Sequence, residues 1–200
     1  MISSLTVEKL ACVRGDRKLF DGLSFRVGAG QALAVEGANG AGKTSLLRML
    51  AGFLAPAAGR IVMKSGDSES DDAEERGKSI GWLGHQDGLK AQLTVREQLD
   101  FFAHLHGRRA DDNALERVGL ARQAQLPCRY LSAGQRRRLA LARLLVSERP
   151  VWLLDEPFAA LDAAGQGLIA QLMARHCGHG GIIIAATHDP LGLGNESLKL

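Results

Sequence analysis

Residues 32–50 read ALAVEGANGAGKTSLLRML, and this stretch decides the fold. A short apolar strand at 32–35 leads into glycines at 37, 40 and 42, and a helical pattern then runs from Lys43 until Gly52 stops it. A strand, a glycine-rich loop and a helix in this order are typical of an α/β protein. The loop also matches the pattern G-x-x-x-x-G-K-[ST] at every defined position, from residue 37 to residue 44.

The pattern predicts a loop that binds the phosphates of a nucleotide. Its glycines let the backbone approach a phosphate closely, and its N–H groups and the N-terminus of the next helix add positive potential. Lys43 is expected to neutralise the β- and γ-phosphates, and the Thr44 hydroxyl is expected to bind Mg²⁺. A plain glycine turn before a helix is the alternative, but it leaves the Lys43–Thr44 pair unexplained. The residues expected to contact the nucleotide here are Gly37, Ala38, Asn39, Gly40, Ala41, Gly42, Lys43, Thr44 and Ser45.

Two acids follow a second apolar strand. Residues 151–154 are apolar without alternation, as in a parallel strand that is covered on both faces. Asp155 and Glu156 come next and precede Pro157. We expect Asp155 to hold Mg²⁺, through water, and Glu156 to polarise the attacking water as a general base. A turn that merely begins with an acid is the alternative, and the pair of acids in a chain with a phosphate loop disfavours it.

The composition is that of one ordinary globular domain. The chain has 200 residues, 46% of them hydrophobic and 24% charged, which is enough to bury a core. The net charge of +3 argues against a dedicated nucleic-acid binder. Three scattered cysteines imply no disulfide framework, so a reducing compartment is expected. No apolar run approaches the ~18 residues of a membrane-spanning helix, so we expect that this chain does not cross a bilayer by itself.

A helical block interrupts the α/β pattern. Residues 94–97 match a capping box at the start of one helix, and a second helix is expected to begin at Asp111 or Asp112. A third helix is expected to include residues 136–143, with Arg136 to Arg138 on a face that is exposed to solvent. Strands are expected at 23–27 and 182–187. A helix is expected to begin at about Asp162, after the strand at 151–154 and before the strand at 182–187. The acidic residues 66–78 are expected to form an exposed, mobile loop.

One further segment narrows the class. Residues 131–135 read LSAGQ and resemble the LSGGQ signature of ABC-type ATPases, with Ala133 in place of the first signature glycine. The resemblance covers nearly the whole chain, and six short motifs occur in the order typical of the family. Each motif is weak alone, but the ordered set is very specific. Besides the phosphate loop and the signature they are the Q-loop Gln86, the strand and acids at 151–156, the D-loop at 160–162 and the switch histidine His188.

The resemblance implies a fold and its division. The fold would be that of the P-loop NTPases, an ABC-type nucleotide-binding domain with a RecA-like core, a small antiparallel β subdomain and an inserted α-helical subdomain. The chain would form a single ABC ATPase domain over residues 1–200. Residues 1–86 and 148–200 would make the core and the β subdomain, and residues 87–147 would make the helical subdomain that carries the signature.

The resemblance also implies shared sites in a homodimer. Ser132, Gly134 and Gln135 would bind the γ-phosphate of ATP held by the opposing subunit, so that two nucleotides lie in a head-to-tail dimer. The signature opens a helix, and a helix N-terminus attracts anions. ATP would hold the dimer together and hydrolysis would release it.

The remaining site residues are implied in the same way. Gln86 would sense Mg²⁺ and the attacking water, which makes it both a catalytic residue and a metal ligand. His188 would contact the γ-phosphate and orient Glu156. Arg14 stands where the family usually has an aromatic residue that stacks on adenine. Arginine can stack on a planar base, so binding need not be lost, but selectivity for adenine is left open.

Within the family, residues 81–90 and 135–144 resemble the ATP-binding subunit of the cytochrome c maturation (haem exporter) transporter. This implies an ATPase with ATP and Mg²⁺ as cofactors, at the cytoplasmic face of the bacterial inner membrane. Integral membrane subunits (CcmB-like and CcmC-like) would be its partners, and nucleic acid would not be bound. Phe101, Phe102 and Leu105 could line a groove for such a partner, or could equally belong to the helical core.

Two other functions compete with a transporter subunit. A soluble ABC-type ATPase that acts on nucleic acid or ribosomes usually carries two cassettes or a long coiled-coil insertion, and this chain has one cassette and no heptads. A small-molecule kinase with the same phosphate loop leaves the signature and His188 unexplained.

Overall fold

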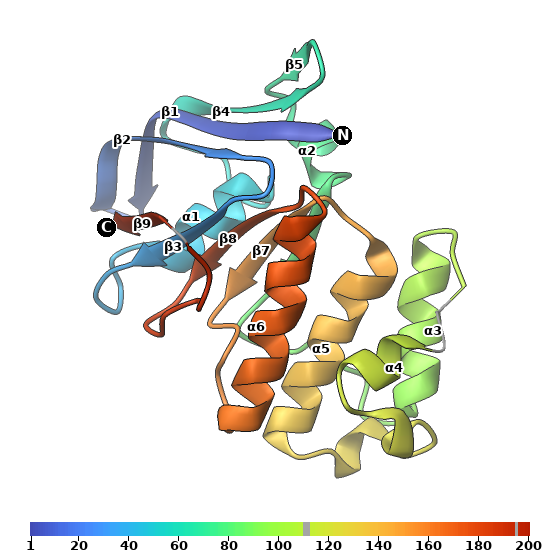
Figure 1. The fold of residues 1–200 in the computed structure, drawn as a ribbon. Helices are drawn as coiled ribbons and strands as arrows, with labels where there is room; N and C mark the ends of the chain where they lie inside the picture. Colours follow the sequence, from blue (N-terminus) through green and yellow to red (C-terminus); the bar gives the residue numbers. More distant parts are fainter. Residues whose placement is uncertain (110–112, 195) are drawn as a thin grey trace.

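A parallel five-stranded sheet forms the centre of the molecule (Figure 1). The computed structural model describes residues 1–109, 113–194 and 196–200. All four pairings in this sheet are parallel, and β7 and β8 are buried at every residue, as expected for strands covered on both faces. In spatial order the strands are β6 (Ile80–Leu83), β7 (Val151–Asp155), β8 (Ile182–Ala186), β3 (Ala32–Glu36) and β9 (Glu196–Lys199).

A second, antiparallel sheet lies on the same side of the first as helix α1 (Lys43–Leu50). Its long strands β1 and β2 form a hairpin that places Leu19 and Phe20 beside Gly42 of the phosphate-binding segment. The order is β2 (Arg17–Gly28), β1 (Ile2–Arg14), β4 (Ala58–Ser65) and β5 (Ser68–Ser70). The strand expected at 23–27 is thus confirmed as the last part of β2.

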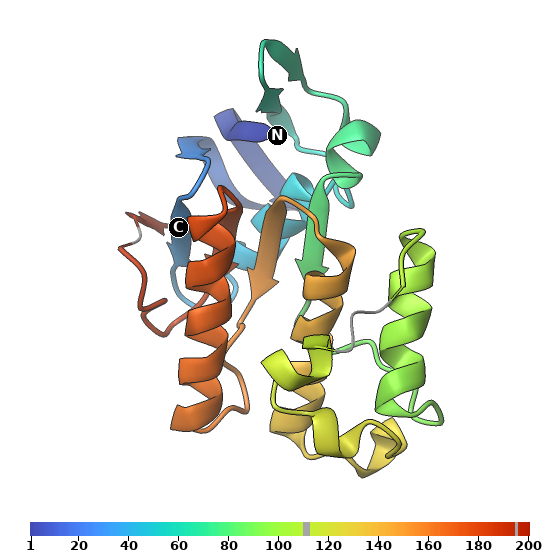
Figure 2. The same cartoon turned by 45° about the vertical axis from the view of Figure 1, so that its right-hand side comes forward.

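Two hydrophobic clusters cover the two faces of the parallel sheet. Alternate residues of a strand point to opposite faces. Leu33 and Leu153 accordingly pack in a cluster with helix α1 (Lys43–Leu50) and the antiparallel sheet, whereas Ala34 and Leu154 pack in a cluster with the helices of the other face. Figure 2 shows this layering, with the long helices on one side of the sheet and the antiparallel strands on the other.

Helices α5 (Ala133–Ser147) and α6 (Ala163–Gly178) run along the second face (Figure 1). The helix expected from about Asp162 is confirmed, because the Asp162 carboxylate caps α6 by accepting a hydrogen bond from the Gly165 N–H at 2.8 Å. The strand expected at 182–187 is β8, which ends one residue earlier.

The helical block contains α3 (Val95–Leu105), α4 (Asn113–Arg117) and α5, together with 3₁₀ turns at Ala121–Gln123 and Cys128–Tyr130. The capping box at 94–97 is present as expected: Thr94 Oγ1 accepts from the Glu97 N–H, and the Glu97 carboxylate accepts from the Thr94 N–H at 2.8 Å. The start expected for the second helix, at Asp111 or Asp112, lies outside the described residues. None of the described helices is long and apolar enough to cross a membrane.

The prediction of a loop at 66–78 was wrong for most of that segment. Its residues form β5, which pairs with β4, and the short helix α2 (Ala73–Gly77), which Asp72 caps. The reason is Arg76, which is buried and donates hydrogen bonds to the carbonyl oxygens of Leu50 and Ile61. Charge and polarity alone gave no sign of this anchor, although most of the acidic side chains are exposed as expected. Strand β9 was not anticipated either, since its residues are mostly exposed.

Candidate functional site

The phosphate loop joins β3 to α1 with backbone conformations that require glycine. Gly42 has a φ of 110°, and a Cβ at this position would lie 3.1 Å from the ring of Phe20 on the β1–β2 hairpin. At Gly37 a Cβ would lie 2.9 Å from the carbonyl oxygen of Leu200. Gly42 also leaves the first turn of α1 without a side-chain cap. The N–H groups of that turn are therefore available to an anion.

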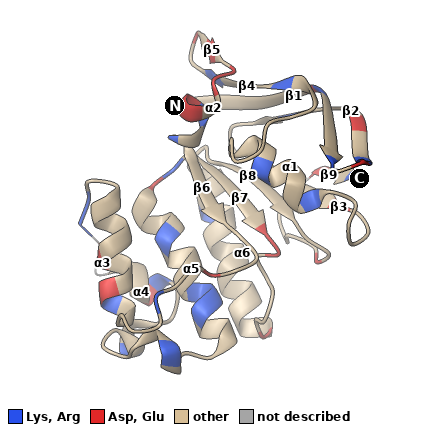
Figure 3. Cartoon of the chain, turned by 180° about the vertical axis from the view of Figure 1, so that it is seen from behind, with Lys and Arg blue, Asp and Glu red and all other residues tan. Residues whose placement is uncertain are grey.

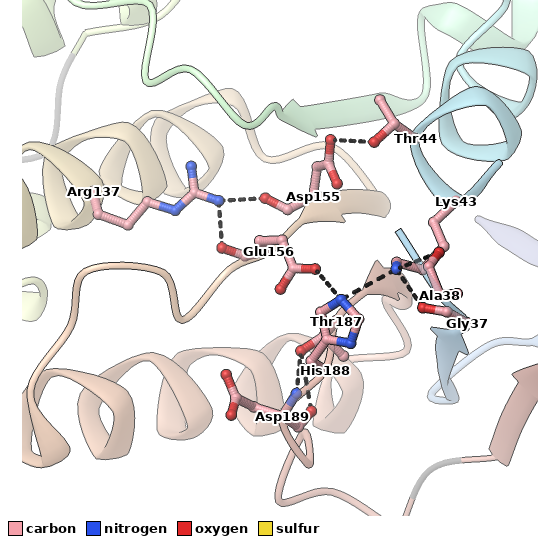
Figure 4. A network of polar contacts seen from close by, with 10 residues as sticks. All are labelled: Gly37, Ala38, Lys43, Thr44, Arg137, Asp155, Glu156, Thr187, His188 and Asp189. Carbon is pink, nitrogen blue, oxygen red and sulfur yellow. Dashed lines mark hydrogen bonds and ion pairs between the residues drawn. The ribbon is translucent and has the colours of Figure 1, made fainter. Parts of the chain in front are cut away.

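Lys43 folds back over this loop. Its ammonium donates to the carbonyl oxygen of Gly37 at 2.6 Å and lies 3.4 Å from that of Ala38 (Figure 4). Nε2 of His188 lies 3.2 Å from the same ammonium. Because an ammonium can only donate, Nε2 is the acceptor of this contact. The cation is thus held at the mouth of the loop, where a phosphate would meet it.

Thr44 and Asp155 place two oxygen atoms side by side. The Thr44 hydroxyl donates to Asp155 Oδ2 at 2.9 Å, and Asp155 is 4% exposed at the end of β7. A hydroxyl and a carboxylate are hard oxygen donors of the kind that Mg²⁺ prefers, and Mg²⁺ usually takes its other ligands from phosphates and water. The residues present therefore fit the metal that the sequence predicted.

Glu156 and His188 face each other across the site. Glu156 Oε1 lies 3.7 Å from His188 Nε2, which is a close approach rather than a hydrogen bond (Figure 4). The Glu156 backbone is left-handed, with a φ of 51°, and its N–H donates to the carbonyl oxygen of Ala186 at 2.8 Å. A tight turn fixes His188 from the other side, because the Thr187 hydroxyl accepts from the Asp189 N–H at 2.9 Å.

Lys43, Thr44, Asp155 and Glu156 line one cavity of about 340 Å³. His188 is not part of that lining and approaches the site through Lys43 and Glu156. The lining combines the backbone of the phosphate loop, one cation and two carboxylates, an arrangement suited to a polyphosphate with a divalent cation. His85 and Leu19 also line it, and neither was anticipated. The lining residues are Leu19, Ala38, Asn39, Gly40, Gly42, Lys43, Thr44, Ser45, His85, Asp155 and Glu156.

Some predicted site residues lie apart from this cavity. Gln86 is exposed, and its neighbour His85 rather than Gln86 lines the cavity. Arg14 is exposed at the end of β1, where it pairs with Arg17 across the hairpin. The structure therefore brings most of the phosphate loop, Asp155 and Glu156 to one cavity, with His188 beside Lys43 and Glu156. Among the predicted site residues, Gly37, Ala41, Gln86 and Arg14 do not line this cavity.

The signature segment also lies outside the cavity, at the N-terminus of α5. The Ser132 hydroxyl accepts from the Gln135 N–H at 3.2 Å, and Gln135 Oε1 accepts from the Ser132 N–H at 2.9 Å. This capping box leaves Ser132 exposed at a helix N-terminus. Gly134 packs against the D-loop of the same chain, because a Cβ at Gly134 would lie 2.9 Å from the carbonyl oxygen of Ala160.

The prediction that Arg136 to Arg138 lie on a solvent-exposed face was wrong for Arg137. Arg137 is 3% exposed and reaches the backbone of Asp155 and Glu156, while its two neighbours are half-buried. A signal was available in the sequence: position 137 shares one helical face with Leu141 and Leu144, which are buried.

A protein-family comparison matches residues 20–159 to the family described as ABC transporter. The chain is 53% identical to the cytochrome c biogenesis ATP-binding export protein CcmA of Rhodopseudomonas palustris (strain BisB5), over 96% of this chain and 94% of the relative. It is 51% identical to the protein of the same name from Nitrobacter winogradskyi, with the same coverage.

Solved structures agree on the fold. The structure of cbiO1 from Clostridium perfringens, described as part of the ABC transporter complex cbiONQ, superposes with a TM-score of 0.78 at 31% identity, over 94% of this chain and 80% of that one. A bacterial Atm1-family ABC exporter with ATP bound superposes with a TM-score of 0.79 at 26% identity, over 94% of this chain and 35% of that one.

Proposed function

The chain belongs to the ABC transporter family of ATP-binding proteins, and from this premise we propose that it powers a haem exporter used in cytochrome c maturation. In this proposal the chain binds and hydrolyses ATP and drives membrane partner subunits. The observation that carries the ATPase part is the shared cavity, where the phosphate loop meets the carboxylates of Asp155 and Glu156. The names of the relatives support the choice of transport system.

The phosphate loop would bind the triphosphate through its backbone N–H groups and Lys43. Thr44 and Asp155, whose oxygens lie together, would hold Mg²⁺, with Gln86 as a further ligand. A bound Mg²⁺ would neutralise part of the negative charge of the phosphates. The loop residues assigned to the nucleotide are Gly37, Ala38, Asn39, Gly40, Ala41, Gly42, Lys43, Thr44 and Ser45.

Glu156 would act as the general base. The oxygen of a water molecule attacks the γ-phosphorus, the bond between this phosphorus and the β,γ-bridging oxygen breaks, and the water proton passes to the Glu156 carboxylate. His188, which lies 3.7 Å from this carboxylate and 3.2 Å from the Lys43 ammonium, would orient Glu156 against the γ-phosphate. Gln86 would contact the attacking water, which requires its exposed side chain to turn toward the cavity.

We further propose a homodimer with shared sites. Ser132, Gly134 and Gln135 lie outside the cavity of their own chain, yet they form an exposed helix N-terminus suited to an anion. A second copy in head-to-tail orientation would present them to the γ-phosphate.

Arg14, exposed at its hairpin, would provide a planar surface for the base. The proposed divisions are a core and β subdomain over 1–86 and 148–200, and a helical subdomain over 87–147.

The proposed partners are integral membrane subunits of the CcmB-like and CcmC-like kind, at the cytoplasmic face of the inner membrane. The exposure of Phe101 and Leu105, 40% and 62% on α3, supports a docking role for these two side chains. Exposed large apolar side chains of this kind are typical of contact surfaces. Phe102 instead packs against the hydrophobic core of the helical face. Action on nucleic acid or ribosomes is the disfavoured alternative, since the relatives named above are export proteins.

A pull-down from gently solubilised membranes tests this proposal. The tagged full chain should recover integral membrane subunits, whereas the variant Leu105→Asp should recover less of them at the same ATP affinity. Thr6→Asp, on the antiparallel sheet, serves as the matched control and should behave as the parent. Recovery of ribosomal proteins or nucleic acid in place of membrane subunits would contradict the proposal.

A further inference from the structure

A single buried arginine connects three functional segments of the molecule. Arg137 lies in the second turn of α5, a helix that also carries Arg136, Arg138 and Arg143. Figure 3 shows the basic residues of this helix as blue segments along α5. The exposed fraction of Arg137 is 3%, and its guanidinium faces the strand end that carries the two acids (Figure 4). A guanidinium so deeply buried is rare unless its N–H groups find partners.

The first pair of partners is the backbone of the two acids. Nη2 of Arg137 donates to the carbonyl oxygen of Glu156 at 2.7 Å and to that of Asp155. Glu156 is thus held from both sides, because its own N–H donates to Ala186. Its left-handed backbone is uncommon for a residue other than glycine, and it persists only where neighbouring groups determine it. Arg137 is one of the groups that determine it.

The second pair of partners belongs to the loop around Gln86. Nη1 of Arg137 donates to the carbonyl oxygen of Gly84 at 2.8 Å and to Asp87 Oδ1 at 3.1 Å. These two acceptors lie on either side of Gln86 in the sequence. Arg143 adds a third tether from the same helix, because its Nη1 donates to the carbonyl oxygen of Gly88 at 3.2 Å.

The planar guanidinium of Arg137 therefore holds three segments in fixed positions relative to one another. The helix that presents the signature, the loop that carries Gln86 and the backbone of Glu156 meet at the two Nη atoms of Arg137. Lysine could keep the charge opposite Asp87, but its single ammonium lacks the planar fork that reaches all four acceptors.

We propose that Arg137 is a positioning residue of the ATPase site, which holds the Glu156 carboxylate in its working direction and ties the Gln86 loop to the signature helix. This inference rests on the proposed role of Glu156 as the base. Arg137 does not line the nucleotide cavity. It contacts Asp155 and Glu156, which do line it, through their backbone carbonyl oxygens and not through their carboxylates. Its loss should therefore slow the chemical step and spare nucleotide binding.

The test compares Arg137→Gln and Arg137→Lys with Arg138→Gln in the full chain. Arg138 is a matched control, since it donates to the carbonyl oxygens of Val118 and Gly119 in the helical block. The measurements are kcat and KM from phosphate release, and the Kd of ATP from calorimetry. We expect Arg137→Gln to lower kcat about tenfold or more with KM and Kd changed less than about threefold, and Arg138→Gln to stay within about twofold. Arg137→Lys should fall between them.

A double-mutant cycle with Glu156→Gln separates positioning from general damage to the fold. If Arg137 acts through Glu156, adding Arg137→Gln to Glu156→Gln should cause little further loss of the residual turnover. Equal fold losses in both backgrounds, or a kcat of Arg137→Gln within about twofold of the parent, would overturn the proposal. Should Arg137→Gln fail to fold, Arg137→Lys enters the same cycle under the same criteria.

The cycle also distinguishes two failures. If Glu156→Gln slows hydrolysis and the Arg137 variants do not, the positioning role is wrong while the proposed function stands. If Glu156→Gln itself keeps the parent's turnover, Glu156 is not the base, and both the proposed mechanism and the role of Arg137 fall.

Discussion

The Thr44 hydroxyl donates a 2.9 Å hydrogen bond to Oδ2 of Asp155, although the two residues are 111 positions apart in the sequence. The bond joins the first turn of α1 to the end of β7. It brings together the two side chains that the sequence predicts to hold Mg²⁺. A hydroxyl and a carboxylate this close supply two hard oxygen atoms where phosphate and water would complete the coordination of Mg²⁺.

The variant Thr44→Val tests that assignment. It keeps the volume of the side chain and removes the hydroxyl, so Mg²⁺ loses one oxygen ligand. We expect the Mg²⁺ concentration for half-maximal hydrolysis to rise about tenfold or more, measured by phosphate release over a Mg²⁺ series. Thr6→Val, on β1 and away from the cavity, is the control. An unchanged Mg²⁺ curve for Thr44→Val would show that Thr44 is not a ligand.

Arg76 should make a large contribution to stability. Burial disfavours its charged form and lowers its pKa, so its hydrogen bonds to Leu50 and Ile61 must offset that cost. The charge also complements the C-terminal end of α1. We expect Arg76→Ala to lower the free energy of unfolding by about 2 kcal/mol or more, measured by urea denaturation. Arg60→Ala, which breaks the exposed pair with Glu8, should change it much less, because solvent screens an exposed ion pair. Equal effects of the two substitutions would contradict this account.

His176 should make the fold sensitive to acid. Burial against the ring of Trp152, at a centroid distance of 3.9 Å, lowers the pKa of His176 to about 4. An unfolded chain binds this proton near pH 6.5 and the folded chain does not, so stability is fully present above about 6.5 and falls as the pH drops toward 4. We expect a loss of up to about 3 kcal/mol over that window.

The variant His176→Phe keeps the stacking and removes the titration. Its melting temperature should vary less than the parent's between pH 6.5 and pH 4, while His104→Gln, at an exposed position, should follow the parent. Parallel curves for the parent and His176→Phe would rule out His176 as the source of the acid sensitivity.

The shared-site dimer predicts a selective defect for Ser132→Arg. A bulky cation at this exposed N-cap should block the approach of a second copy without touching the cavity of its own chain. In the Glu156→Gln background, light scattering should show an ATP-dependent dimer that Ser132→Arg abolishes, while ATP binding to the single chain survives. If dimerisation and binding were lost together, the signature would serve its own chain and the head-to-tail arrangement would be wrong.

Local signals explain what could be predicted from the sequence. The phosphate loop is encoded by adjacent residues, because glycine spacing, Lys43 and Thr44 specify both its backbone and its chemistry. Strand β7 is encoded by its apolar run, and the cap of α3 by Thr94 and Glu97. The roles of Gln86 and Arg14 stay predictions, since the structure leaves both side chains exposed outside the cavity.

Tertiary contacts explain the rest. Arg76 orders its segment through carbonyl groups of α1 and β4, which no local pattern reveals. Strand β9 is polar and forms because the edge of β3 is available for pairing. In the sequence Arg137 is only part of a basic run, and its role follows from the fold, in which it donates to the backbone carbonyl oxygen of Glu156. Each of these residues depends on partners distant in the chain.

The rate of phosphate release by Glu156→Gln tests the central claim most directly. The substitution keeps the size of the side chain and removes its capacity to accept the proton of the attacking water. Hydrolysis should fall by about 10²-fold or more while the Kd of ATP changes little, because a general base contributes 10²–10⁴-fold and does not bind the nucleotide. Turnover of Glu156→Gln equal to that of the parent would contradict the account.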